Sequence, residues 1–238
     1  MKNAFLSLFL VIELISPAQS GRFRHFTTDD GLAQNSIFAI AQDKQGFLWV
    51  GTQDGICRYD GFNFIRYGPD PDDSTSLPGN SVKSMIADSK GNIWIGTRSG
   101  LCRYNPDKNN FTRFPSNVES DKGTASPIIM AIAEDRNGRI WVGTLDKGLN
   151  CYDPANGKFR NFRHDDKTST SLQGNDVRGL AIDNKGELWI TTWGHGTSHY
   201  IESSSSFEMI PNRPGESTPL NSRGAICCDK KEIGRAHV

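Results

Sequence analysis

The sequence predicts an all-β protein, a β-propeller with four complete four-stranded blades and the start of a fifth. Three observations support this prediction. Tryptophan recurs at positions 49, 94, 141 and 189, at intervals of 45, 47 and 48 residues. The residues around each tryptophan recur as well, and glycine and proline, with 24 and 11 residues, are frequent enough for many turns. A repeat of about 40–50 residues with this pattern is typical of propeller blades.

The recurring positions define a unit with a fixed internal order. An aspartate lies six residues before each tryptophan and a glycine three before it. A Gly-Thr pair follows in three units, and Thr191-Thr192 follows in the fourth. Because apolar residues occur on both faces of the predicted strands, we expect the tryptophans to pack between neighbouring blades rather than to bind a ligand. The structural repeat consists of Asp43 with Trp49, Asp88 with Trp94, Asp135 with Trp141, and Asp183 with Trp189.

The first unit shows how each blade is expected to form its strands. Residues 36–41 form an inner strand, and the turn at 43–46 suits a hairpin because aspartate bonds nearby backbone and glycine accepts positive φ. Residues 47–52 form the second strand, with Leu48 and Val50 on one face and Trp49 on the other. A turn at 53–55 leads to a third strand at 56–59, and residues 62–67 form the outer strand.

A fifth unit begins near residue 220 but loses the pattern. Asp229 occupies the aspartate position, whereas Glu232 and Arg235 stand where glycine and tryptophan are expected. Residues 232–238 also match the translation of a common short-read sequencing adapter. We therefore expect the native sequence to continue beyond Lys231 and residues 232–238 to be an artefact, the alternative being an ordinary terminal peptide. Residues 21–231 would then be part of a larger propeller, since propellers close with about four to eight blades.

Residues 1–20 have the features of a secretory signal peptide. Lys2 provides the positive start, residues 4–15 are mostly apolar, and small residues precede a predicted cleavage site before Gly21. A helix over this apolar stretch reaches only about 18 Å, too short for a hydrocarbon core of roughly 30 Å. Glu13 departs from the apolar pattern, and a buried N-terminal helix is the alternative. The sequence favours export.

Charge and composition exclude several classes of function. Lysine and arginine together number 27, as do aspartate and glutamate, so the formal net charge is zero and a nucleic-acid-binding protein is not expected. The repeated aspartates lie in equivalent turns of different blades, too far apart for a paired acid and base, so no catalytic residues are expected. His195 and His199 would lie about 13 Å apart on a strand, so neither a metal site nor a cofactor is expected.

Three cysteines occupy similar places near the recurring tyrosine of successive units, namely Cys57, Cys102 and Cys151. Equivalent positions on successive blades normally lie beyond the Cα separation of about 7 Å that a disulfide allows. We therefore expect these cysteines to be buried free thiols. Cys227 and Cys228 belong to the interrupted fifth unit, and the sequence gives no basis for assigning their state.

A candidate ligand-binding site is predicted where the loops after the tryptophan strands meet the connections between blades. These loops vary in charge and size between units, as expected of a site on a regular scaffold. Planar amides, one arginine and an aromatic face suit sugar hydroxyls and an acidic group. Alternatively, the asparagines bond loop backbone, and Arg98 and Trp193 are ordinary surface residues. The candidates are Asn35, Gln53, Asn80, Arg98, Asp146, Lys147, Asn175, Trp193 and His195.

Two segments resemble the two-component regulator propeller family. The run HFTTDDGLAQNSI, from His25 to Ile37, is similar to the opening of the family. The run DKQGFLWVGTQDGICRYDG, from Asp43 to Gly61, is similar to its repeat at nearly every position. The resemblance covers roughly residues 23–231. Residues 191–195 of the fourth unit depart from the pattern, which predicts a local change in loop shape.

The resemblance implies a periplasmic sensor with two seven-bladed propellers, followed by a small β-sandwich, a membrane helix and a cytoplasmic output, most often a histidine kinase. The four units would then be part of the first seven-bladed propeller. In gut Bacteroidota, such proteins resemble sensors of oligosaccharides released from polysaccharides. The resemblance also implies a homodimer in the full-length protein and contact with the membrane only through the downstream helix.

We therefore expect the chain to be the exported, periplasmic sensory part of an inner-membrane signalling protein of the hybrid sensor histidine kinase type, without catalysis of its own. Binding of an oligosaccharide or a similar ligand would shift the arrangement of a dimer, and the kinase would respond to that shift. The alternatives are a secreted propeller enzyme, such as a lyase or a sialidase-like hydrolase, and an extracellular interaction propeller. Downstream sequence would separate these classes.

Overall fold

The computed structural model describes residues 23–117, 121–210, 226–228 and 233–235. The predicted signal peptide, residues 1–20, lies outside the described residues, as do residues 232 and 236–238 of the predicted adapter segment. Within the described ranges, one turn of 3-10 helix, η1 (Thr28–Asp30), precedes a series of strands. Four four-stranded antiparallel sheets form, each from four consecutive strands. The predicted all-β fold with four complete blades is confirmed.

Each blade contains an inner strand, two middle strands and an outer strand in chain order. Blade 1 comprises β1 (Ile37–Gln42), β2 (Leu48–Thr52), β3 (Gly55–Tyr59) and β4 (Phe64–Tyr67). Blade 2 comprises β5 (Val82–Ala87), β6 (Ile93–Thr97), β7 (Leu101–Asn105) and β8 (Asn110–Phe114). Blade 3 comprises β9 (Ile129–Glu134), β10 (Ile140–Thr144), β11 (Leu149–Asp153) and β12 (Lys158–Phe162). Blade 4 comprises β13 (Val177–Ile182), β14 (Leu188–Thr192), β15 (Gly196–Ile201) and β16 (Ser206–Met209).

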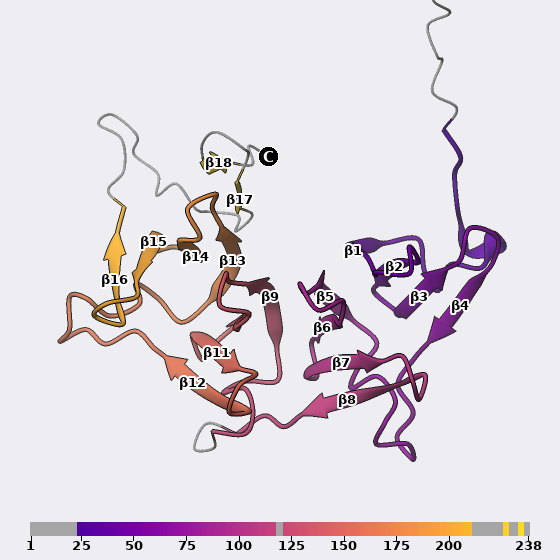
Figure 1. The fold of residues 1–238 in the computed structure, drawn as a ribbon, viewed down its shortest axis with the longest axis horizontal. Coiled ribbons are helices and arrows are strands. Elements are labelled where there is room, and N and C mark those ends of the chain that lie inside the picture. The colour runs from indigo at the N-terminus through magenta and orange to yellow at the C-terminus, as the bar shows by residue number, and fades with distance from the viewer. Residues whose placement is uncertain (1–22, 118–120, 211–225, 229–232, 236–238) are drawn as a thin grey trace, which may run out of the picture.

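The blades follow one another around an open arc, with β1, β5, β9 and β13 along its concave side (Figure 1). A further antiparallel pair, β17 (Ile226–Cys228) and β18 (Ile233–Arg235), lies beyond blade 4, and β17 contacts β13. This pair occupies the place of the first hairpin of a fifth blade. Cys227 pairs with Gly234. In blade 1 the corresponding residue, Ala41, pairs with Trp49, so the β17–β18 hairpin is one residue shorter.

The hydrophobic core lies between blades. Trp49 of blade 1 packs in one cluster with Met85, Ile93 and Ile95 of blade 2. The same arrangement joins blade 2 to blade 3 and blade 3 to blade 4, around Trp94 and Trp141 respectively. These three tryptophans are at most 1% exposed. The predicted packing between blades is therefore confirmed for these three tryptophans, whereas Trp189 of blade 4 is half-buried and stacks on His199 of its own blade.

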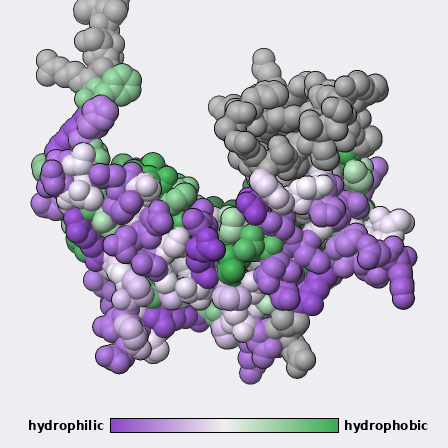
Figure 2. Space-filling model, turned by 180° about the vertical axis from the view of Figure 1, so that it is seen from behind, coloured by the Kyte–Doolittle hydropathy of each residue, from purple (hydrophilic) through white to green (hydrophobic). Residues whose placement is uncertain are grey.

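Among the described residues, blade 1 has no neighbouring blade on one face. Ile40 and Leu48 are 62% and 39% exposed, whereas the equivalent residues of blade 2, Met85 and Ile93, are 6% and 1% exposed. Phe26, from the segment before η1, packs against Tyr59 and covers part of this blade, with ring centroids 5.1 Å apart. Figure 2 shows hydrophobic surface gathered along the concave side of the arc, while the outer rim is mostly hydrophilic.

Candidate functional site

The turn end of each blade, defined by the hairpins at 43–46, 88–91, 135–138 and 183–186, is fixed by the repeated aspartate. One carboxylate oxygen accepts the indole N–H of the tryptophan six residues later, which explains this spacing. The Nε1 to Oδ2 distances are 2.8 Å for Trp49, 2.9 Å for Trp94, 2.7 Å for Trp141 and 3.1 Å for Trp189. In blade 1 the other oxygen accepts the backbone N–H groups of Gln45 and Phe47. The carboxylate of each aspartate therefore accepts hydrogen bonds from its own hairpin and stabilises it.

A cation or an imidazole lies over each tryptophan. The distances to the ring centroids are 5.8 Å for Arg58 over Trp49, 5.6 Å for Arg103 over Trp94, 5.5 Å for Arg139 over Trp141, and 4.8 Å for His199 stacked on Trp189. In blade 3 the arginine comes from a different position, because Cys151 is the residue paired with Trp141. The arginine over Trp141 is instead Arg139, which lies in the turn just before β10. Arg139 also binds Asp135 and Glu202.

Two carboxylates at the turn end, those of Asp183 and Glu202, are held in their ionised forms. Burial opposes ionisation of Asp183, but N–H donors from Glu187, Trp189 and Lys185 outweigh it, so the pKa of Asp183 lies below its ordinary value. The hydrogen bond from Arg139 lowers the pKa of Glu202 in the same direction. A carboxyl group held in this way is a poor proton donor at neutral pH. The turn end therefore has a structural role.

The loop end of each blade lies at the other end of the sheet and brings the predicted candidates together. The N–H group that follows the second strand donates to the carbonyl of the residue before the inner strand. These bonds join Gln53 to Ser36 (3.3 Å), Arg98 to Ser81 (3.0 Å), Leu145 to Ile128 (3.1 Å) and Trp193 to Asp176 (2.8 Å). The loops after the tryptophan strands and the blade connections therefore share one end of the propeller.

The three predicted asparagines tie loop segments together. Asn35 Oδ1 accepts the N–H of Thr28 at 3.0 Å, and Asn175 Oδ1 accepts the N–H of His164 at 2.9 Å. Asn80 differs, because its Nδ2 donates to Asp54 of the preceding blade at 3.2 Å. Asn35 and Asn80 are exposed and Asn175 is half-buried. Two of these loop-end asparagines, Asn35 and Asn175, therefore bond loop backbone, which is the alternative role considered for them.

Blade 3 places Asp146 and Lys147 side by side at the loop end. Ser126 Oγ, which is buried, donates to Asp146 Oδ1 at 2.6 Å. Lys147 Nζ lies 3.9 Å from Asp146 Oδ2, and both side chains are about half exposed. The two predicted residues therefore neutralise each other at the surface.

Blade 4 presents an exposed aromatic ring at the loop end. Trp193 is 42% exposed, and the Arg178 guanidinium lies 4.2 Å from its ring centroid. Two nitrogens of Arg178 bind Asp176 at 2.9–3.2 Å. His195 Nδ1 lies 2.8 Å from the Trp193 carbonyl oxygen. These contacts hold the indole at a fixed angle with one face towards the arginine.

The predicted change of loop shape in blade 4 is a lengthened turn. Thr192 Oγ1 contacts the carbonyl of Gly196, four residues on, whereas Thr52 in blade 1 contacts the carbonyl of Gly55, three residues on. The strand register is unaffected, since Thr191 pairs with Thr197 and with Gly179. Blade 3 has the same longer turn, between Thr144 and Gly148. The extra residue moves the loop without disturbing the sheet.

Sequence reasoning missed a set of residues placed by β-bulges. In blade 1, Ile37 pairs with Thr52 and Ala39 with Gly51, so Phe38 is the extra residue. The same register shift occurs at the start of the other three inner strands. A bulge leaves its extra residue unpaired and redirects the side chain. The equivalent residues are Lys83, Met130 and Arg178.

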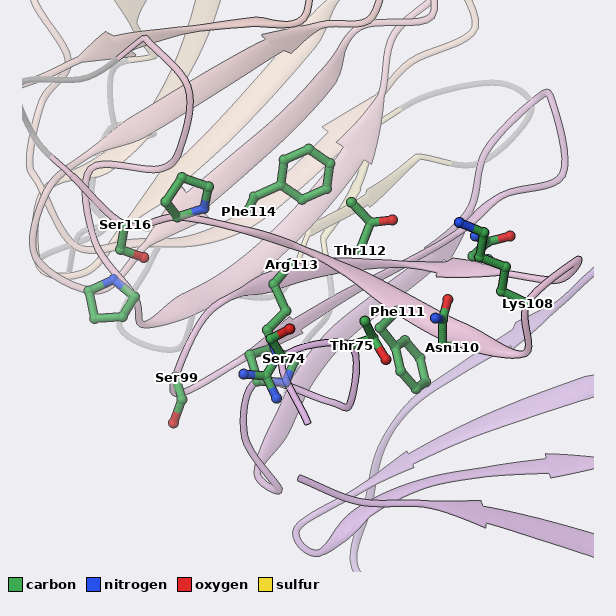
Figure 3. A pocket seen from close by; sticks show the side chains of 14 residues that line it. Ser74, Thr75, Ser99, Lys108, Asn110, Phe111, Thr112, Arg113, Phe114 and Ser116 are labelled. Atoms are coloured by element: carbon green, nitrogen blue, oxygen red, sulfur yellow. The ribbon is translucent and has the colours of Figure 1, made fainter. Parts of the chain in front are cut away.

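Two of the pockets in the described part of the chain are informative, and the first is lined in part by Pro78 and Ser99, close in sequence to the candidates Asn80 and Arg98. The first, of about 680 Å³, runs along β8 on the outer rim. Figure 3 shows Arg113 extending from β8 towards the connection that bears Ser74 and Thr75. Its guanidinium donates to the carbonyls of Asp73, Ser76 and Leu77. These bonds use the guanidinium to hold the connection between blades 1 and 2 in place.

The second pocket, of about 520 Å³, lies at the turn end between blades 3 and 4. At the interface of blades 1 and 2, Arg58 donates to Tyr104 Oη at 3.0 Å. Between blades 3 and 4 the residue at that position is Cys151, and the hydroxyl of Tyr200 is buried without a protein hydrogen bond. The arginine that bonds the tyrosine between blades 1 and 2 thus has no counterpart on the equivalent strand here, and Arg139 lines the pocket instead.

Cys57, Cys102 and Cys151 are buried free thiols, as predicted. Burial raises the pKa of each thiol, that of Cys151 to about 12. Thiolate is the reactive form, so these cysteines are unreactive in the folded chain. The side chains of Cys227 and Cys228 lie outside the described part of the chain.

His195 and His199 have separate contacts, the first with its own loop and the second with Trp189. Among the described residues, no group of three or more histidine, cysteine, aspartate or glutamate side chains could hold a metal ion. No helix in the same residues is long and apolar enough to cross a membrane.

The repeat decides the family. The sequence pattern described as "Two component regulator propeller" matches residues 31–54, 76–99, 123–146 and 171–194, one segment in each blade. The four blades belong to the two-component regulator propeller family. Each matched segment of the regulator propeller runs from a blade connection, through the aspartate and tryptophan, to the loop after the second strand. It therefore includes both ends of the blade.

Two signalling proteins are similar to this regulator propeller. Over 75 residues the chain is 45% identical to histidine kinase P4 of Formosa agariphila, covering 32% of this chain and 6% of the kinase. It superposes on the extracellular domain described as part of a hybrid two-component system of Bacteroides thetaiotaomicron, with a TM-score of 0.69 and 27% identity, over 79% of this chain and 26% of that one. The chain therefore spans a small part of both relatives.

Virginiamycin B lyase of Staphylococcus aureus shares the fold alone. The TM-score is 0.62 at 15% identity, and the superposition covers 84% of this chain and 63% of the lyase. Because one fold serves unrelated functions, this likeness says nothing about chemistry.

Proposed function

We propose that the chain is an exported sensory propeller of a two-component signalling protein of the hybrid sensor histidine kinase type. In this proposal its loop end binds an extracellular ligand, an oligosaccharide or a similar molecule. The contrast between the two ends of the blades is the observation that supports it. The turn end repeats one set of bonds in all four blades. The loop end presents a different side chain in each blade, as binding sites on regular scaffolds do.

The loop end has the chemical groups that a sugar requires. Trp193 offers a partly exposed ring on which the apolar face of a sugar can lie. Gln53 and Arg98 are exposed, and within the described residues their side chains make no hydrogen bond or ion pair. Their amide and guanidinium groups are therefore available to hydroxyl and acidic groups. Similarity to histidine kinase P4 supports the signalling context.

Signalling of this kind requires differential binding and no chemistry in the propeller. A ligand shifts an equilibrium between two arrangements only by the difference in its affinity for them. In the proposed full-length homodimer, a ligand at the loop end would favour one arrangement of the two sensory regions. The downstream kinase would respond to that arrangement across the inner membrane. The propeller itself stays in the periplasm and contacts the membrane only through a downstream helix.

A binding screen tests the proposal. The folded chain is titrated calorimetrically with a panel of neutral and acidic oligosaccharides. We expect at least one ligand to bind, and Trp193→Ala to weaken its binding about tenfold, or about 1.4 kcal/mol. Lys185→Ala, which changes an exposed turn-end residue of the same blade, should leave binding unchanged. Failure of the folded chain to bind any member contradicts ligand sensing, and cleavage of the ligand would instead support a secreted lyase or hydrolase.

A further inference from the structure

The bulge residue and the loop residue of each blade form a pair at the loop end. Both adjoin the same short segment, because the loop N–H bonds the carbonyl two residues before the bulge. In blade 4 the members are in contact, with Arg178 stacked on Trp193. The four pairs differ completely in chemistry. They are Phe38 with Gln53, Lys83 with Arg98, Met130 with Leu145, and Arg178 with Trp193.

The pair in blade 2 consists of two cations without a counter-ion. Within the described residues, neither Lys83 nor Arg98 makes an ion pair or a side-chain hydrogen bond. Other loop-end cations are compensated, since Arg178 binds Asp176 and Lys147 lies beside Asp146. Partial burial, and then the charge of Arg98, lower the pKa of Lys83. The two side chains therefore repel each other in a place where a counter-charge is missing.

An exposed aromatic ring completes this cluster from the neighbouring blade. Lys83 Nζ lies 4.0 Å from the ring centroid of Phe38, which is 47% exposed. The bulge in β1 turns Phe38 out of the ladder and towards blade 2, so the contact depends on that irregularity. The result is an exposed aromatic ring with one cation, Lys83, over it and a second, Arg98, near enough to Lys83 to lower its pKa.

We propose that Phe38, Lys83 and Arg98 form a binding site for an acidic saccharide, one whose ring bears a carboxylate or a sulfate. This inference rests on the proposed function of the loop end and specifies its ligand class. Arg98 suits bidentate recognition of a planar carboxylate or a sulfate, while Lys83 supplies a compact charge. The apolar face of the sugar ring packs on Phe38. The next pair, Met130 with Leu145, is apolar, so the requirement for an anion is confined to the junction of blades 1 and 2.

The test compares an acidic probe with its neutral counterpart on the full chain. Trigalacturonate and galactotriose are titrated calorimetrically into the wild type, Lys83→Met, Arg98→Met and the control Lys90→Met, which removes an exposed turn-end lysine. We expect the wild type and Lys90→Met to prefer trigalacturonate at least about tenfold, and either loop-end variant to lose that preference. The preference should also fall as salt rises, because exposed charges are screened.

A measurement without ligand accompanies the titration. Two uncompensated cations repel each other in the absence of ligand, and Arg98→Met removes this repulsion without breaking a side-chain contact among the described residues, so it should leave the melting temperature unchanged or raise it. A fall would show that the pair is structural and overturn the inference. Equal binding of both saccharides, unaffected by the variants, would also overturn it while leaving ligand binding at the loop end intact. Binding of galactotriose alone would do the same, whereas Trp193→Ala tests the loop end independently of charge.

Discussion

The two ends of each blade are built from the same repeat but obey opposite rules. At the turn end, an aspartate carboxylate that accepts an indole N–H and two backbone N–H groups recurs in every blade. At the loop end, one backbone bond and one bond from a threonine Oγ1 to a glycine carbonyl recur, and the exposed side chains around them change from blade to blade. Stability is therefore concentrated at one end of the sheet. The other end is held by these two bonds and is free to vary its exposed side chains.

Replacing one tryptophan from each end gives the sharpest contrast. Trp94→Ala removes a side chain that is 1% exposed between blades 2 and 3 and should cost about 3–5 kcal/mol of unfolding free energy. Trp193→Ala removes a loop-end ring that is 42% exposed and should change stability by no more than about 0.5 kcal/mol. Urea unfolding followed by circular dichroism measures both. Equal losses would show that the two ends do not differ in this way.

An aspartate from each end provides the second contrast. Asp88→Asn leaves the shape intact but removes the charge that accepts from Trp94 and from Lys90 and Asn92, at a cost of about 2–3 kcal/mol. Asp54→Asn, an exposed loop-end residue, should be nearly neutral. The indole N–H resonance of Trp94 should move in the first variant alone. An unchanged resonance together with unchanged stability would show that the Asp88 carboxylate does not stabilise the turn end.

Glycine spacing between blades gives a smaller effect. A Cβ at Gly96 would lie 2.5 Å from Ile129 Cγ2 of the next blade, so Gly96→Ala should cost about 1–3 kcal/mol. Gly68→Ala is the matched control, because nothing lies within 4 Å of its Cβ position. Thermal unfolding of both variants measures the difference. A neutral Gly96→Ala would mean that blades 2 and 3 can separate slightly without loss.

The smallest effect concerns pH at the loop end. Hydrogen bonds to the Leu172 carbonyl and to Asp166 raise the pKa of His164. The folded state thus favours the protonated ring. This contribution is complete below the ordinary pKa of about 6.5 and is lost as pH rises through the higher folded-state value. Between pH 6 and pH 8 the wild type should lose slightly more stability than His164→Gln, and NMR titration of the ring should give the raised pKa directly.

The frame of the blades was predictable because each of its parts has a local cause. The interval between Trp49 and Trp94 is the length of one blade. The six-residue separation of Asp43 and Trp49 lets the indole N–H bond the carboxylate across the hairpin. Gly46 has a φ of 91°, as the predicted turn requires. The strands of blade 1 begin and end within two residues of the predicted positions.

The loop end was predictable only in part. Arg98 and Trp193 are visible in the sequence because they interrupt a repeat at a known loop. Phe38 and Lys83 are not, because a bulge is a property of backbone pairing and its four residues share no side-chain feature. The sequence signal that could have found them is the variability of the position itself. In each inner strand the bulge residue varies, whereas the residue before it is always Ile or Val and the residue after it is always small. The sequence also does not show that Arg139 takes the place of Arg58 over the tryptophan. The two arginines stand at different positions of the repeat, and only the structure shows that both lie over the equivalent indole ring.

The buried thiols give the chain a set of internal chemical reporters. Cys102 lies in the core that joins blades 1 and 2, Cys151 in the core that joins blades 3 and 4, and Cys57 in the cluster beneath Leu32. A protected thiol can be alkylated only while its own cluster is open, so each alkylation rate reports the opening free energy of one cluster. Mass spectrometry of the labelled peptides would then rank the three clusters without adding any probe. In an array whose units contact only their neighbours, that ranking shows where unfolding starts.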